Sequence, residues 1–144
     1  MNYPNGRTIS FEPNLLYEPV LKGVQELLGE KRFKFYMNGL SDTENQLDLY
    51  IPNVDGVPYM QEASLTMTQF EKPWVHDRLK TYGTKLTFIP VRASFKIADN
   101  LIEQADVVKI DAEGAEMSVL RGMHDIIRKS KPIFLVENKL ASCY

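Results

Sequence analysis

The strand–helix–strand pattern of residues 106–136 constrains the fold of this chain more than any other feature. Residues 106–111 read as a short apolar strand with polar residues at its C-terminal end, and Glu113-Gly114 turns the chain into a segment with helically spaced apolar residues. Lys131-Pro132 ends that segment, and residues 133–136 form a second, wholly apolar strand. Two continuously apolar strands joined by a helix are typical of a βαβ unit whose parallel strands are buried on both faces.

The rest of the chain also alternates strands and helices. The patterns predict strands over 7–11, 32–37, 46–51 and 85–91, and helices over 15–28 and 97–104. Pro19 either marks where the first helix begins or distorts its first turn. We therefore predict an α/β fold with an open, mostly parallel sheet and helices on both faces. Residues 52–83, which hold three prolines, are expected to be an irregular insertion within a single domain of residues 1–144.

Length and composition exclude several classes of protein. A chain of 144 residues fits one domain of ordinary size. Its net charge of −2 offers no general attraction for nucleic acid, and no apolar run approaches the roughly 18 residues of a membrane span. Cys143 is the single cysteine, which excludes an internal disulfide framework. The N-terminus lacks the apolar core of a signal peptide, so we expect a cytoplasmic location.

Polar residues follow several of the predicted strands, at the edge of the sheet where open α/β proteins bind ligands. Glu12 could accept hydrogen bonds from a ribose diol or stabilise the N-terminus of the following helix. Ser41 and Asp42 could border an adenine ring or only close a turn. Asn14, a preferred helix cap, and Asn38 lie at the same strand ends, and we count both among the candidate cofactor-binding residues.

Lys109, Asp111 and Glu113 form the second group of candidate residues. They are two positions apart, so they point the same way if the strand stays extended. Charged side chains are tolerated there if the strand reaches the open edge of the sheet, where a polar substrate would dock. The alternative is a Lys–carboxylate pair followed by acids at a helix N-terminus. A divalent cation held by Asp111 and Glu113 is a further alternative, but two carboxylates are too few ligands to assign one, and we name no metal-binding residue.

The residues 106–116 (DVVKIDAEGAE), followed by Val119-Leu120-Arg121-Gly122, closely resemble the signature of FkbM-type methyltransferases. Further segments resemble elements of that family in the family's order. They are residues 10–14, 39–42, 63–65, 97–101 and 132–138.

This resemblance implies a Rossmann-like methyltransferase fold, S-adenosylmethionine as cofactor, and O-methylation of a small-molecule or glycan acceptor, with sugar, lipid or polyketide hydroxyls as the target class. It implies that Glu12 holds the cofactor's ribose hydroxyls and that Ser41 and Asp42 border its adenine. Asp111 is then the candidate base, with Glu113 as second choice. Lys109 is expected to orient Asp111 or the acceptor.

Two features of the family have no counterpart in the sequence. Before the first predicted strand there is no acidic, glycine-rich turn, and after residues 133–136 there is no final hairpin. We therefore expect a partial domain, truncated at both ends. If no upstream segment supplies the glycine-rich turn, we expect this chain alone to methylate nothing measurable. The alternatives are a non-catalytic remnant or binding module that keeps the sheet without binding the cofactor, and a different nucleotide-binding α/β protein.

Overall fold

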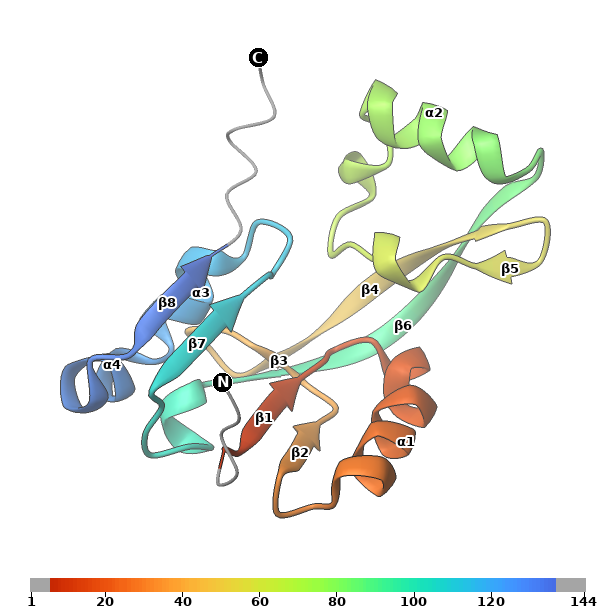
Figure 1. The fold of residues 1–144 in the computed structure, drawn as a ribbon. Coiled ribbons are helices and arrows are strands. Elements are labelled where there is room, and N and C mark those ends of the chain that lie inside the picture. The colour runs from red at the N-terminus through yellow and green to blue at the C-terminus, as the bar shows by residue number, and fades with distance from the viewer. Residues whose placement is uncertain (1–5, 137–144) are drawn as a thin grey trace. The chain divides into compact units, whose positions relative to one another are not determined.

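The computed structural model describes residues 6–136, and the chain divides into two compact units. The first unit comprises residues 1–39 and 46–94, and the second comprises residues 40–45 and 95–144. Figure 1 shows the helices and strands of both units, which we describe one at a time.

The first unit begins with a parallel strand pair joined by a helix. Strand β1 (Thr8–Phe11) pairs with β2 (Phe33–Tyr36), and the register runs from Thr8 opposite Phe33 to Phe11 opposite Tyr36. A 3₁₀ turn, η1 (Leu15–Tyr17), leads into α1 (Glu18–Leu28), which Figure 1 shows beside the two strands. Pro19 lies in the first turn of α1, where a missing N–H breaks no helical hydrogen bond. Of the two interpretations of Pro19, the helix that begins near it is confirmed.

The rest of the first unit contains regular structure where the sequence predicted an irregular segment. Residues 52–83 include the end of a strand, a second short strand and a helix whose Val75 and Leu79 are buried. These two side chains pack with Val54 and Phe70 in one apolar cluster. Pro73 begins the helix, so one of the three prolines starts regular structure rather than preventing it. The elements are β4 (Asn45–Val54), β5 (Val57–Pro58), η2 (Met60–Glu62), η3 (Met67–Gln69), α2 (Pro73–Tyr82) and β6 (Leu86–Lys96).

The second unit contains the predicted βαβ pattern. Strands β7 (Val107–Ile110) and β8 (Ile133–Val136) are parallel, with Val107 opposite Ile133 and Ile110 opposite Val136. The connecting helix is interrupted, because α3 (Glu116–Arg121) ends at Gly122 and α4 (His124–Ser130) begins after Met123. The helix expected over 97–104 is only a 3₁₀ turn, η4 (Ala98–Asn100). The residues 38–42 (NGLSD) predict a turn, and the structure has the short strand β3 (Gly39–Leu40) within them.

These elements confirm the α/β class, although the sheets are not purely parallel, since β4 and β5 are antiparallel. The expectation that β7 and β8 are buried on both faces is wrong for the described residues. On one face, Ile110 packs with Val119, Met123 and Ile126 of the following helices. On the other face, side chains such as Ile133 are exposed, at 67%. The reason is that α3 and α4 both pack on the same face of a two-stranded sheet.

Asp55 joins the β4–β5 turn to the start of β6, and its replacement tests this link. Its carboxylate accepts hydrogen bonds from the backbone N–H groups of Thr84 (3.0 Å) and Lys85 (2.9 Å). These bonds hold the pKa of Asp55 below its ordinary value of 3.8. The ionised group therefore stabilises the fold at neutral pH, and this contribution is lost as the pH falls through the lowered pKa.

We expect Asp55→Asn to lower Tm at pH 7 and to differ less from the native protein as the pH approaches 3. Asparagine tolerates the positive φ of 50° at this position but loses the charge that strengthens both hydrogen bonds. Thermal unfolding followed by circular dichroism across this pH range measures the effect. Asp77→Asn, at an exposed position of α2, is the control. An equal Tm loss at pH 3 and pH 7 would contradict an electrostatic role for Asp55.

Candidate active site

Glu12 follows β1 directly, so it lies at the carboxyl end of a strand, where open α/β proteins bind ligands. Its backbone N–H donates to the carbonyl of Tyr36 at the end of β2 (3.1 Å). Its Oε1 accepts a hydrogen bond from the backbone N–H of Asn14 (2.7 Å). Burial raises the pKa of Glu12 above 4.5, against the smaller opposing effect of that hydrogen bond. The carboxylate is therefore incompletely hydrated, and further hydrogen-bond donors would stabilise its charged form.

Asn14 has a structural role that the sequence indicated through its preference for helix caps. The side chain is 1% exposed, and its Oδ1 accepts from the N–H of Leu16 (3.1 Å) at the start of η1. Its Nδ2 donates to the carbonyl of Met60 (3.3 Å), which ties η1 to η2. Both ends of the amide are thus engaged by backbone groups, and its contact with a cofactor stays a prediction.

Asn38 and Tyr17 lie in the same unit as Glu12. Asn38 lies two residues beyond β2, the neighbour of β1, and its Nδ2 donates to the carbonyl of Gly39 (3.0 Å). Tyr17 was not predicted from the sequence. Burial raises its pKa, and the negative charge of Glu12 raises it further. In the sequence, only the spacing of five residues between Glu12 and Tyr17 could have indicated that the two side chains interact. In the structure, Tyr17 is the last residue of η1.

Ser41 and Asp42 form a turn that is held firmly within the second unit. The N–H of Ser41 donates to the carbonyl of Lys96 at the end of β6 (2.8 Å). The hydroxyl of Ser41 donates to Oδ1 of Asp42 (3.3 Å), and the Asp42 carboxylate lies 3.6 Å from the guanidinium of Arg121. Two residues further on, a hydrogen bond from the Lys96 ammonium (2.8 Å) lowers the pKa of Glu44. The turn is therefore an ordered feature rather than a loose loop.

Lys109 and Asp111 form an ion pair at the carboxyl end of β7, with Nζ 3.1 Å from Oδ2. The strand ends at Ile110, and Glu113 has a positive φ of 52°. The extended form therefore does not persist to Glu113, so the condition under which all three side chains would point the same way is not met. The Lys–carboxylate pair that the sequence left open as an alternative is present. It does not exclude catalysis, because the same pair can orient the Asp111 carboxylate.

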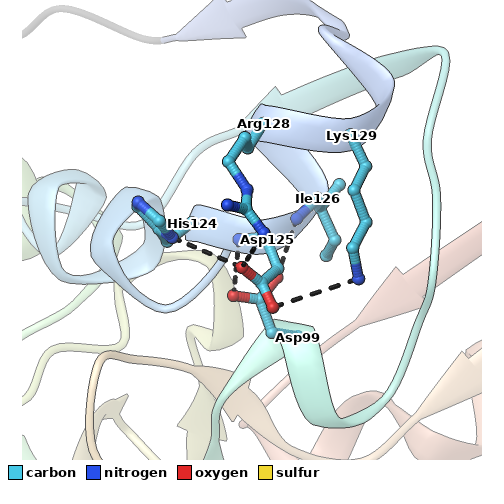
Figure 2. A network of polar contacts seen from close by, with 6 residues as sticks. All are labelled: Asp99, His124, Asp125, Ile126, Arg128 and Lys129. Atoms are coloured by element: carbon cyan, nitrogen blue, oxygen red, sulfur yellow. Dashed lines mark hydrogen bonds and ion pairs between the residues drawn. The ribbon is translucent and has the colours of Figure 1, made fainter.

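His124, one of the two histidines of the chain, belongs to a polar network around Asp125 (Figure 2). Asp99 accepts hydrogen bonds from the backbone N–H groups of Asp125 (2.9 Å) and Ile126 (3.0 Å), so it caps the start of α4 from a distant part of the chain. His124 lies 3.5 Å from the Asp125 carboxylate on an exposed face, beside Arg128. This network stabilises α4.

The candidate residues thus fall into two groups. Glu12, Asn14 and Asn38 belong to the first unit, and the second unit holds Ser41, Asp42, Lys109, Asp111 and Glu113. Within residues 6–136, no three His, Cys, Asp or Glu side chains are placed to hold a metal ion, and no helix is long and apolar enough to cross a membrane. Cys143 lies outside this described range.

Parallel strands joined by helices, with acidic residues directly after β1 and β7, define an α/β protein of the kind that binds its ligand at the carboxyl ends of strands. The family model described as "Methyltransferase FkbM domain" matches residues 3–142. The chain therefore belongs to the FkbM methyltransferase domain family.

A crystal structure supports the fold. The chain is similar to a methyltransferase FkbM from Methylobacillus flagellatus KT, with a TM-score of 0.54 and 17% sequence identity. The match covers 90% of this chain and 25% of that protein, so the chain spans about a quarter of its structural relative. A search of proteins with curated functions finds no match.

Proposed function

We propose that this domain transfers a methyl group from S-adenosylmethionine to a hydroxyl of a sugar, lipid or polyketide-type acceptor. The match to the methyltransferase family over residues 3–142 carries the proposal. The acids after β1 and β7 support it, because they lie where an α/β protein binds its ligand.

Glu12 is the residue that fits the cofactor best. Burial leaves the Glu12 carboxylate incompletely hydrated and raises its pKa, and the two hydroxyls of a ribose would supply further hydrogen-bond donors. Ser41 and Asp42 would border the adenine ring, and Asn38 would lie near the ribose. S-adenosylmethionine supplies an electrophilic methyl group on a positively charged sulfur.

Asp111 would act as the general base. As the acceptor oxygen bonds to the methyl carbon and the bond from that carbon to sulfur breaks, Asp111 would take the hydroxyl proton. Lys109, 3.1 Å away, would orient the carboxylate or the acceptor. Glu113 is the second candidate for the base. Most of the rate enhancement would come from alignment of oxygen, carbon and sulfur.

Glu12→Gln tests cofactor binding. We expect isothermal titration with S-adenosylmethionine or S-adenosylhomocysteine to show binding to the native chain. The variant should bind at least about 10-fold more weakly than the native chain, since hydrogen bonds to a charged group contribute roughly 1.5–3 kcal/mol.

Glu12→Gln should also raise Tm at pH 7, because it removes a poorly hydrated charge. The sign follows from the raised pKa. The ionised form destabilises the fold above pH 4.5, so the gain should vanish as the pH falls and Glu12 becomes protonated.

Glu26→Gln, at an exposed position of α1, is the matched control and should change neither the affinity nor the pH dependence. If the native chain gives no heat with millimolar cofactor, the proposal fails. That outcome would favour the alternative, a non-catalytic module that keeps the fold without binding the cofactor.

A further inference from the structure

Helix α3 has the loop that carries Asp111 and Glu113 at one end and the Ser41–Asp42 turn at the other. Both contacts lie within the second unit. We propose that Glu116 and Gly122, at the two ends of α3, are positioning residues that hold these two segments at a set spacing. The spacing rests on the geometry alone, and only its catalytic meaning rests on the proposed function.

Glu116 orders the loop at the first end of α3. Its Oε1 accepts hydrogen bonds from the backbone N–H groups of Ala112 (3.3 Å) and Gly114 (3.0 Å). Between these two residues, Glu113 has φ 52°, a conformation that residues other than glycine adopt at an energetic cost. Charge-assisted hydrogen bonds on both sides of Glu113 compensate for that cost. The direction in which the loop presents Asp111 and Glu113 therefore depends on Glu116.

Gly122 allows close approach at the other end of α3. Its φ of −74° is open to any residue, so the backbone conformation does not require glycine. A Cβ at this position would lie 2.1 Å from the carbonyl oxygen of Ser41 and 2.8 Å from its carbonyl carbon. Backbone atoms cannot rotate out of the way as a flexible side chain can. Any side chain at position 122 must therefore displace either the turn or the end of the helix.

Neighbouring contacts hold the turn against this glycine. Arg121 approaches the Asp42 carboxylate at 3.6 Å, and the N–H of Ser41 is bonded to Lys96 on its other side. The carbonyl of Gly122 accepts from the N–H of Asp99 (3.0 Å), the residue that caps α4. The interruption between α3 and α4 is thus the point where the turn, η4 and both helices meet. The six residues of α3 span about 9 Å, at roughly 1.5 Å per residue, which is the spacing that it sets.

Amide hydrogen exchange tests the positioning without any cofactor. We expect Gly122→Ala to speed exchange of the Ser41 amide at least 10-fold relative to that of Ile133, whose N–H is bonded to the carbonyl of Asp106 (2.9 Å) and not to a residue of the Ser41–Asp42 turn. Gly23→Ala is the control, because a Cβ there meets nothing within 4 Å. Equal effects on the Ser41 and Ile133 amides, or none on Ser41, would overturn the role of Gly122.

Glu116→Ala provides a second variant in case Gly122→Ala fails to fold. The Gly114 amide should then exchange at least 10-fold faster relative to Ile133, and Glu116→Gln, which keeps an acceptor oxygen, should fall between this variant and the native protein. Glu103→Ala, an exposed acid outside both contacts, should change neither amide. An unchanged Gly114 amide in Glu116→Ala would overturn the role of Glu116.

Measurements of cofactor affinity and of the rate of methyl transfer distinguish the roles of the two ends of α3. We expect Gly122→Ala to raise the Kd for S-adenosylhomocysteine about 10-fold, and Glu116→Ala to lower kcat about 10-fold with Kd within twofold of native. Faster exchange with unchanged Kd and kcat would overturn the catalytic meaning of the spacing. If the native protein binds no cofactor, the proposed function fails, while the exchange measurements still decide whether α3 sets the spacing.

Discussion

Asp111→Asn will lower the rate of methyl transfer by about 10²–10⁴-fold, the range that a positioned general base typically contributes. Asparagine matches the size of aspartate but cannot take the proton of the acceptor hydroxyl. It also removes one charge of the ion pair with Lys109 at the carboxyl end of β7. The rate is measured as transfer of a radiolabelled methyl group from S-adenosylmethionine to hydroxyl-bearing acceptors.

Asp106→Asn is the matched control for this experiment. Asp106 lies directly before the opposite end of β7, so the same change of charge occurs away from the proposed site. We expect its rate to stay within about twofold of the native rate. If Asp111→Asn also kept a rate within about twofold of the native rate, Asp111 would be excluded as the base, and the same test would be applied to Glu113.

Ile126→Ala will lower the free energy of unfolding by about 2–5 kcal/mol, the usual loss when a buried isoleucine is cut back to alanine. Ile126 is 1% exposed and lies in the cluster with Ile110, Val119 and Met123 that joins α3 and α4 to β7. The loss combines the hydrophobic transfer of the removed atoms with the cavity that they leave. Urea denaturation followed by circular dichroism measures it.

Ile133→Ala is the control for Ile126→Ala, because the same side chain is removed from a position that is 67% exposed. We expect a loss below about 1 kcal/mol, since little apolar surface leaves water at this site on folding. If the two variants lost equal stability, the outer face of β7 and β8 would have to be covered in solution.

Patterns carried by neighbouring residues predicted much of the fold. The apolar strands at 107–110 and 133–136, the strand pair at 8–11 and 33–36, and the helix after Pro19 all followed from periodicity and local breakers. The expected helix over 97–104 is a single 3₁₀ turn, and the Asp99 side chain within it caps α4, a partner 26 residues away that no local pattern indicates. The buried face of α2 depends on Val54 and Phe70, which no local pattern joins to it.

The candidate site follows the same division. The acids after β1 and β7 were predictable, because the carboxyl end of a strand is visible in the sequence as the point where an apolar run meets polar residues. The cap formed by Asn14 was equally visible as a residue preference. The contact between Gly122 and Ser41 was not, because 81 positions separate the two residues and the missing side chain leaves no pattern.

The sequence by itself determined the α/β class, the βαβ unit and the residue types at the strand ends, because periodicity and turn chemistry act between residues that are close along the chain. Only the tertiary structure decided which face of β7 and β8 is covered, which polar groups are already engaged, and where a glycine is required for close approach. These properties depend on contacts between distant segments, and steric exclusion and burial exist only after those segments have packed together.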